Sequence, residues 1–210
     1  MIAIFGGTFD PLHNGHLALA QEVRAYLGLD SLRMLPCGIP PHRRQPLASI
    51  EQRRCMLEKA LEGEPGLVLD DRELLRPGPS YMVDTLASMR LEYPLNPLVL
   101  IIGSDALCSL HSWHNWQALF EYAHIIVLAR PGYTKPKEDP LSSFLSKRWT
   151  TDSKALSNTP AGRIMLLNLG LLEVSSSQIR EMIQQGHDVS ALLPLPVYKF
   201  IRANSLYCEK

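Results

Sequence analysis

A continuous apolar run, Leu98-Val99-Leu100-Ile101-Ile102, ends at Gly103 and constrains the fold more than any other feature of the sequence. A strand that is apolar at every position is typical of a parallel sheet covered on both faces. Residues 125–129 form a second such run, and shorter apolar runs lie at 2–5, 32–37 and 67–69. Further candidate strands lie at 164–167 and 171–174.

Helical patterns separate these apolar runs. Leu19, Val23 and Leu27 are spaced four apart within 16–27, and Ser49 with Gln52 fits a capping box that opens another helix. Further helices are predicted at 81–91, 116–122, 175–183 and 197–206. Alternating strands and helices predict an α/β fold, a Rossmann-like doubly wound parallel sheet with helices on both faces.

The length of 210 residues fits one domain over 1–210. Residues 133–160 are more polar than the rest of the chain and contain Lys135-Pro136-Lys137-Glu138-Asp139-Pro140. We expect this segment to be a polar surface excursion or mobile loop, not a second domain.

The overall charge excludes some classes of partner. Lys and Arg total 21, as do Asp and Glu, so the formal net charge is zero. A neutral chain without a basic patch is not typical of a nucleic-acid binder or a membrane-surface binder. No apolar stretch approaches the roughly 18 residues needed to span a bilayer. Four scattered cysteines without a C-x-x-C pair favour reduced thiols, and we expect a cytoplasmic protein without structural zinc.

Polar residues follow the predicted strands at 6–16, 36–44, 103–114 and 175–180. In a doubly wound sheet the carboxyl ends of the strands lie at one edge, and ligands bind there, near the point where the strand order reverses. We therefore expect these four segments to converge on one cleft.

The first of these segments carries the strongest motif, Gly6-Gly7-Thr8-Phe9-Asp10-Pro11-Leu12-His13-Asn14-Gly15-His16. Glycines after a strand let the backbone approach a ligand, and the N-terminus of the next helix favours phosphate. His13 and His16 lie three residues apart, so both can face one anion. The motif is neither G-x-G-x-x-G nor a Walker A loop. Alternatives are a plain tight turn with solvated histidines or a metal site, but no Cys or Glu nearby completes a metal set.

Two motifs together resemble the nucleotidyltransferase superfamily of adenylyl and cytidylyl transferases. The first is H-x-G-H, present as His13-Asn14-Gly15-His16. The second is the turn Ser175-Ser176-Ser177-Gln178-Ile179-Arg180, which is similar to the I-S-S-T-x-I-R phosphate-binding turn with conservative changes. Three serines alone would indicate only a helix cap. We expect Arg180 in the first helical turn, where the dipole favours anions over cations, so that its position makes more sense with phosphate bound.

Within that superfamily the whole chain resembles the bacterial nicotinate-nucleotide adenylyltransferase family. The supporting strings are Gly7-Thr8-Phe9-Asp10-Pro11, Pro40-Pro41-His42-Arg43, Ser80-Tyr81-Met82-Val83-Asp84-Thr85-Leu86, Gly103-Ser104-Asp105, Trp113 and Ala129-Arg130-Pro131-Gly132. The resemblance implies that Gly103 and Asp105 hold the adenosine part of ATP, that Thr85 binds the pyridine nucleotide and that Trp113 stacks on the nicotinate ring.

Each implied role has a structural alternative. Asp105 has the residue type of a helix N-cap, and Trp113 has that of a core aromatic. Trp116 fits the core better, packing with Leu119 and Phe120. His42 and Arg43 follow two prolines, and we assign them to the mononucleotide, although Arg43 stands where many family members have Lys and has surface charge as its alternative.

The expected reaction is attack by the 5′-phosphate of nicotinate mononucleotide on the α-phosphorus of ATP, with Mg²⁺ accompanying ATP. His16, His13 and Arg180 are the expected catalytic residues. The expected ATP contacts are Gly6, Gly7, Thr8, Phe9, His13, His16, Gly103, Asp105, Ser175, Ser176, Ser177 and Arg180. A transferase acting on nicotinamide mononucleotide or phosphopantetheine is the alternative within the superfamily, and a nucleotide-sensing binding module is the alternative outside it. The sequence does not fix the oligomeric state.

Overall fold

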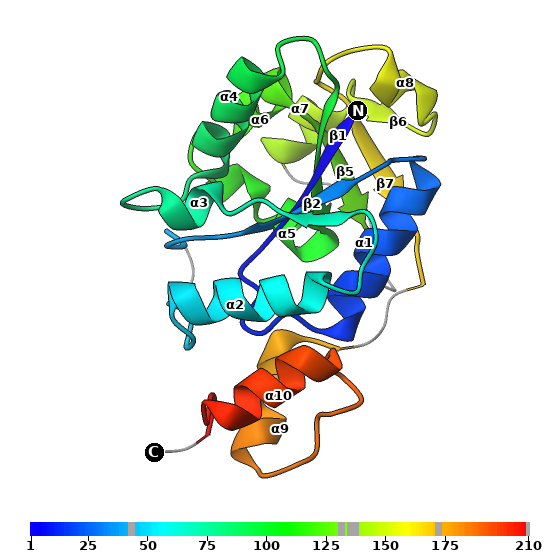
Figure 1. Cartoon of the computed structure of the whole chain (residues 1–210). Helices are drawn as coiled ribbons and strands as arrows, with labels where there is room; N and C mark the ends of the chain where they lie inside the picture. The colour runs from blue at the N-terminus through cyan, green and yellow to red at the C-terminus, as the bar shows by residue number, and fades with distance from the viewer. Residues whose placement is uncertain (42–44, 130–132, 134–138, 171–173, 209–210) are drawn as a thin grey trace.

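The computed structural model describes residues 1–41, 45–129, 133, 139–170 and 174–208. In this part of the chain one parallel sheet has the strand order β3-β2-β1-β4-β5-β7-β6 (Figure 1), which confirms the predicted doubly wound α/β fold. The strands are β1 (Ile2–Gly7), β2 (Leu32–Pro36), β3 (Leu67–Leu69), β4 (Leu98–Gly103), β5 (His124–Leu128), β6 (Trp149–Thr150) and β7 (Ile164–Leu167). Of the candidate strand at 171–174, residues 171–173 lie outside the described residues.

The predicted helices are present with small shifts at their ends. Helix α1 begins at Asn14, earlier than the periodicity of 16–27 indicates, and Ser49 with Gln52 forms the predicted capping box on α2. The α-helices are α1 (Asn14–Tyr26), α2 (Ile50–Leu61), α3 (Arg72–Leu75), α4 (Met82–Glu92), α5 (Ser104–Cys108), α6 (Leu119–Tyr122), α7 (Leu141–Leu145), α8 (Lys154–Ser157), α9 (Ser176–Gln184) and α10 (Leu195–Ala203). Two 3₁₀ turns, η1 (Leu110–Ser112) and η2 (Trp116–Ala118), precede α6.

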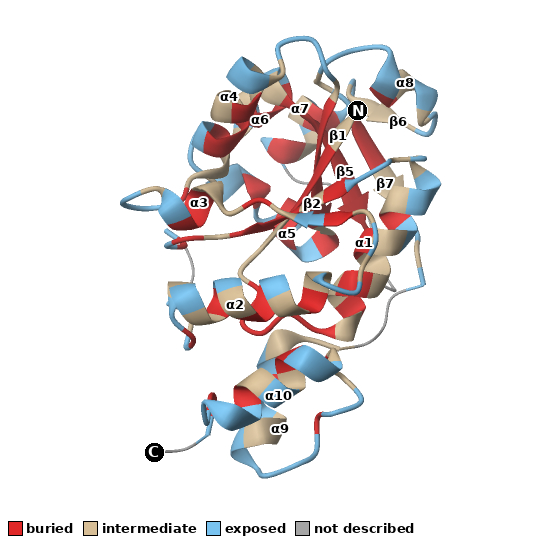
Figure 2. Ribbon diagram, in the orientation of Figure 1, coloured by how far each residue is buried: buried red, intermediate tan, exposed pale blue. Residues whose placement is uncertain are grey.

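The sheet separates two hydrophobic clusters, because successive strand residues point to opposite faces. In β4, Val99 and Ile101 belong to the cluster that includes buried residues of α1, α2, α9 and α10. Leu98, Leu100 and Ile102 belong to the other, which includes residues of α4, α6 and α7. The central strands are mostly red in Figure 2, and pale blue marks outer surfaces of the helices. Burial on both faces explains the unbroken apolar runs.

The segment 133–160 differs from the expected surface excursion. Its described part forms α7, the edge strand β6 and α8. Leu141, Leu145 and Leu156 are buried in the two clusters, and β6 pairs with β7. A few buried apolar residues in a mostly polar stretch make these contacts. The described part of this segment therefore belongs to the sheet and its covering layer.

The strand order reverses between β1 and β4. From β1 the chain extends to β2 and β3 on one side, and β4, β5 and β7 lie on the other. Phe5 pairs with Ile101, so the glycines that end β1 and β4 lie at the same edge of the sheet. This is the position at which doubly wound folds bind ligands. Among the described residues, no helix has the length and apolar character required to cross a membrane.

Candidate active site

His13 and His16 lie together at the start of α1. His13 is the N-cap residue, its backbone N–H donates to His16 Nδ1 at 3.3 Å, and the two rings stack with centroids 3.7 Å apart. An Nδ1 that accepts this bond places the proton of a neutral imidazole on Nε2, which makes Nε2 of His16 a donor. A Cβ on Gly15 would lie 2.9 Å from Val174 and 3.1 Å from His13 Nδ1. A side chain at position 15 would therefore press against Val174 and the His13 ring, which glycine avoids.

The loop between β1 and α1 is itself a packed structure. Phe9 has φ 49°, in the left-handed region, and its ring is buried with its centroid 5.1 Å from that of His16. A Cβ on Gly7 would lie 2.8 Å from the Phe9 ring. Gly6 and Thr8 are half-buried and line the same turn. Any ATP contact from Phe9 must therefore come from its backbone, because its ring belongs to the core.

Asp10 connects this loop to distant parts of the chain. Its side chain is buried and accepts from the backbone N–H groups of Leu47 at 2.8 Å and Ala48 at 3.1 Å. It also accepts from the Tyr207 hydroxyl at 2.7 Å. Its backbone carbonyl accepts from Arg180 Nη1 at 2.6 Å. Asp10 therefore positions groups and is not an exposed base.

The serine turn lies against the same loop. Ser175 caps α9 by accepting from the N–H of Gln178, as the helix-cap alternative predicts. Ser176 Oγ donates to Pro11 O at 2.9 Å, and Arg180 Nη2 donates to Ser177 Oγ at 3.2 Å. Arg180 is the fifth residue of α9 and so lies in its second turn, not its first. The two predicted motifs therefore converge, with the guanidinium of Arg180 fixed beside the loop that carries the histidines.

Arg53 is a functional candidate that the sequence analysis did not find. Its side chain is 1% exposed, and its guanidinium donates to the carbonyls of Thr8 at 3.0 Å, Cys37 at 2.6 Å and Gly38 at 3.0 Å. Burial lowers its pKa. It joins the loop after β1 to the loop after β2. The sequence does hold a weak indication of this role. Arg53 lies one turn after Ser49 and shares a helix face with Met56 and Leu57, and a charged residue is unexpected on such an apolar face.

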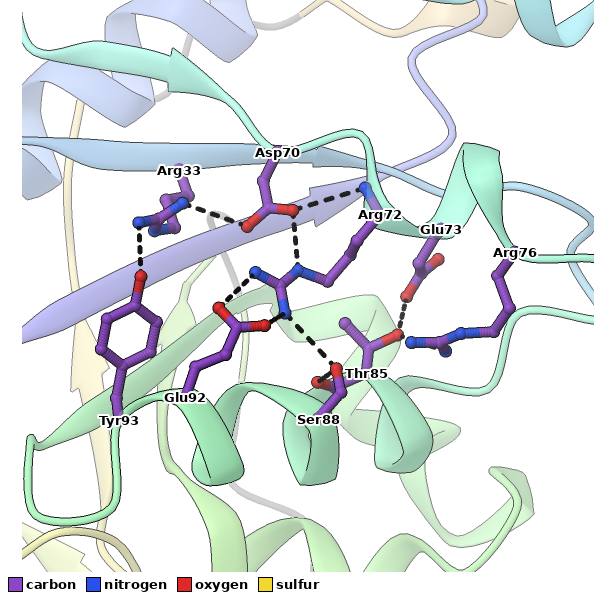
Figure 3. A network of polar contacts seen from close by, with 9 residues as sticks. All are labelled: Arg33, Asp70, Arg72, Glu73, Arg76, Thr85, Ser88, Glu92 and Tyr93. Atoms are coloured by element: carbon purple, nitrogen blue, oxygen red, sulfur yellow. Dashed lines mark hydrogen bonds and ion pairs between the residues drawn. The ribbon is translucent and has the colours of Figure 1, made fainter.

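Thr85 lies inside a polar network that Figure 3 shows from close by. The residue is fully buried, its hydroxyl donates to Glu73 Oε1 at 2.7 Å, and it accepts from Arg76 Nη1 at 3.1 Å. Glu73 is also buried, and desolvation raises its pKa. The Thr85 hydroxyl therefore already donates its proton to Glu73. A bound pyridine ring could contact the backbone of Thr85 or its neighbouring residues, but it would not receive a hydrogen bond from this hydroxyl.

An ion-pair cluster lies beside this network, between β3 and α4 (Figure 3). Asp70 accepts from Arg33 at 3.3 Å and from Arg72 Nε at 2.7 Å, and Arg72 also pairs with Glu92. These contacts join β2, α3 and α4 on the side of the fold that carries Thr85.

Gly103 and Asp105 lie where β4 gives way to α5. Gly103 is the N-cap residue, and a Cβ there would lie 2.6 Å from Asp105 Oδ1. The Asp105 carboxylate therefore lies over the glycine, and the residue is exposed. An exposed carboxylate at the reversal point of the sheet suits a ribose hydroxyl.

Trp113 and Trp116 differ in their surroundings. The Trp116 ring packs against the cluster that includes Leu119 and Phe120, as expected, and contacts Phe144 of α7 edge-on with centroids 4.8 Å apart. Trp113 is half-buried and follows η1. Its neighbour His114 contacts the Tyr81 ring at 4.5 Å, which brings this segment to the start of the helix that carries Thr85.

Two expected substrate contacts, His42 and Arg43, lie outside the described residues. Of the described residues on either side, Ile39 bridges to Pro79, and the backbone N–H of Leu47 donates to Asp10. Among the described residues, no three His, Cys, Asp or Glu side chains gather to hold a metal ion.

Comparison with known proteins gives consistent matches. The pattern of the cytidylyltransferase-like family matches residues 4–182. A Methylococcus capsulatus protein named "Probable nicotinate-nucleotide adenylyltransferase" is 47% identical over 210 residues, covering 100% of both chains. An Aeromonas salmonicida protein of the same name is 43% identical over 206 residues, 98% of this chain and 96% of that one.

A solved structure shows the same fold. It is Plasmodium falciparum nicotinic acid mononucleotide adenylyltransferase complexed with NaAD, with a TM-score of 0.75 and 17% identity, covering 98% of this chain and 96% of the other.

Proposed function

Since this chain belongs to the cytidylyltransferase-like family, and within it to the nicotinate-nucleotide adenylyltransferases, we propose that it transfers the adenylyl group of ATP to nicotinate mononucleotide. The products are nicotinate adenine dinucleotide and pyrophosphate. The observation that carries the proposal is the convergence of the His13–His16 stack and Arg180 on the loop after β1.

The reaction requires charge stabilisation more than proton transfer. A 5′-phosphate oxygen of the mononucleotide attacks the α-phosphorus of ATP, the new P–O bond forms there, and the bond from the α-phosphorus to the bridging oxygen of pyrophosphate breaks. The nucleophile is already an anion, so no general base is needed. Alignment of the two phosphates and preorganised donors supply the catalysis.

The chain's own groups have distinct parts in this scheme. The Nε2–H of His16 and the His13 ring face the α-phosphate and the leaving oxygens, and α1 adds the partial positive charge of its N-terminus. Arg180, held by Asp10 and Ser177, neutralises the triphosphate. The proposed ATP contacts are Gly6, Gly7, Thr8, Phe9, Gly103, Asp105, Ser175, Ser176 and Ser177.

We propose that Mg²⁺ arrives as part of the substrate. The described residues offer no cage of carboxylates or imidazoles, whereas Mg²⁺ commonly binds through substrate phosphates and waters. The ion would neutralise charge on the triphosphate.

The mononucleotide is proposed to lie between the loop after β2 and the start of α4, with Trp113 against its ring and His42 and Arg43 at its phosphate. The names of the full-length relatives support nicotinate over nicotinamide as the preferred ring.

The cytoplasm is the proposed location. All four cysteines are free thiols in the structure, which suits a reducing compartment.

A product assay tests the proposed function. Purified protein is mixed with MgATP and, in turn, nicotinate mononucleotide, nicotinamide mononucleotide or phosphopantetheine, and pyrophosphate and the coupled product are both measured. The expected result is the fastest turnover with nicotinate mononucleotide. Faster turnover with either other acceptor would overturn the substrate assignment, and nucleotide binding without pyrophosphate release would identify a binding module.

A further inference from the structure

The last described residues turn back onto the molecule after α10. Ser205 and Tyr207 have φ values of 47° and 64°, in the left-handed region that non-glycine residues rarely adopt. Tyr207 is nevertheless only 7% exposed, and Leu206 beside it is 9% exposed. Backbone conformations of this kind persist where surrounding contacts over-determine them. The contacts of Tyr207 therefore hold the tail in a specific path.

The polar contact that holds Tyr207 is made to the first loop of the chain. Its hydroxyl donates to Asp10 Oδ1 at 2.7 Å across a separation of 197 residues. Asp10 is 4% exposed, so bulk water does not reach this carboxylate readily. Burial and the neighbouring Asp10 raise the pKa of Tyr207, which keeps the hydroxyl proton available for the bond.

Asp10 transmits this contact to the residues proposed to act on substrate. Its carboxylate holds the backbone of Leu47 and Ala48, which follow the loop that carries His42 and Arg43. Its backbone carbonyl holds Arg180. The positive guanidinium of Arg180 also lies 3.9 Å from Asp10 Oδ2. A shift of Asp10 would therefore move both the arginine and the loop after β2.

Helix α10 supplies no residue to the proposed reaction, whereas α9 supplies Arg180. Figure 1 shows α9 and α10 together beyond α2, at the end of the molecule away from β6, and α10 contacts α2. Packing alone would require an apolar residue at position 207, and phenylalanine would supply it. The buried hydrogen bond between the Tyr207 hydroxyl and the Asp10 carboxylate instead indicates that the position of Asp10 must be fixed.

We infer that Tyr207 is a positioning residue of the active site, whose hydroxyl fixes Asp10 and through it the placement of Arg180 and of the loop after β2. The inference rests on the proposed function for its kinetic consequences. It makes residues 205–208 part of the catalytic apparatus although none of them is among the proposed substrate contacts.

Tyr207→Phe tests the inference because it removes the hydroxyl and keeps the ring. We expect kcat to fall about tenfold, since a misplacement of about 1 Å costs up to 10²-fold, with the KM for each nucleotide changed less than about twofold. Tyr198→Phe, on α10, is the matched control and should leave kcat unchanged. A Tyr207→Phe enzyme with wild-type kcat, or one whose activity falls only in proportion to lost folded protein, would overturn the inference.

A double-mutant cycle with Asp10→Asn tests whether Tyr207 acts through Asp10. In the Asp10→Asn background, Tyr207→Phe should lower kcat by less than about twofold. Independent, multiplicative losses would contradict the proposed connection.

Hydrogen exchange provides a readout that does not depend on the reaction. In Tyr207→Phe the amides of Leu47 and Ala48 should exchange faster, while those of β4 stay unchanged. Unchanged exchange at both residues would refute the positioning role. A wild-type protein that makes no dinucleotide would instead refute the proposed function, so the two failures are distinguishable.

Discussion

His13 and His16 stack ring on ring, with centroids 3.7 Å apart and planes inclined by 27°, at the first turn of α1. This contact leaves two roles for one side chain, because Nδ1 of His16 accepts the N–H of His13 while its Nε2 is the proposed donor to substrate. The same side chain therefore closes the helix start and is proposed to act in the reaction.

His16→Ala is expected to lower kcat by roughly 10² to 10³, the usual cost of one preorganised transition-state donor. It should also cost about 1 kcal/mol in stability, because the His13 N–H loses its partner at the helix start. Steady-state kinetics and a thermal melt measure the two effects. Retention of more than about half of wild-type kcat would disprove the catalytic role, and His187→Ala, at an exposed site, is the control.

Arg53→Met is expected to destabilise the fold by at least about 3 kcal/mol, because each buried carbonyl left without a donor costs about 1–3 kcal/mol. The affected carbonyls are those of Thr8, Cys37 and Gly38. Arg54 is a matched neighbour whose side chain is 46% exposed and pairs with Glu58 and Asp71. Arg54→Met should cost less than about 1 kcal/mol. Equal losses in denaturant unfolding would show that Arg53 does not join the loops.

The buried imidazole of His124 is expected to make the free energy of unfolding depend on pH. Its ring is fully buried, Nδ1 accepts from the N–H of Arg163 at 3.0 Å, and Nε2 lies 2.8 Å from Thr159 O. Desolvation lowers its pKa. The unfolded chain therefore binds a proton that the folded chain excludes, and stability present above about pH 6.5 is lost as pH falls through the lower folded pKa.

Thermal melts between about pH 7 and pH 5 should show this loss as a lower melting temperature. For a chain of this size, each kcal/mol of lost stability lowers the melting temperature by about 2–4 °C. His124→Gln should be less stable at neutral pH but should lose less on acidification. His187→Gln should keep the wild-type slope. If the His124→Gln curve paralleled the wild type, the buried imidazole would not be the titrating group.

Trp113→Ala is expected to raise the KM for nicotinate mononucleotide more than that for ATP, because lost stacking is worth on the order of 1–3 kcal/mol. Trp116→Ala should instead lower the melting temperature, since its contact with Phe144 supports the layer around α7. Exchanged phenotypes would mean that Trp116 is the stacking residue. Thermal melts of both variants separate unfolding from weakened binding.

Local pattern was sufficient to predict the parallel sheet, the capping box at Ser49 and the position of the H-x-G-H turn before α1. Apolar runs report burial on both faces, and caps depend on residues a few positions apart. The structured segment 141–157 was missed because its buried residues, Leu141, Leu145 and Leu156, are few within a mostly polar stretch.

Long-range polar contacts could not be predicted in the same way. The bonds of Arg53 reach backbone carbonyls, which no side-chain pattern marks. The bond from Tyr207 to Asp10 joins the two ends of the chain. Burial of the Thr85 hydroxyl against Glu73 likewise depends on the packing of α4 on α3 and the loop that follows it.

The most direct test of adenylyl transfer follows the α- and γ-phosphorus atoms of ATP in separate reactions. With nicotinate mononucleotide and ATP labelled at the α-phosphorus, the dinucleotide should carry the label, and with ATP labelled at the γ-phosphorus all label should leave in pyrophosphate. Label from the γ position in the nucleotide product, or release of inorganic phosphate in place of pyrophosphate, would contradict adenylyl transfer at this site.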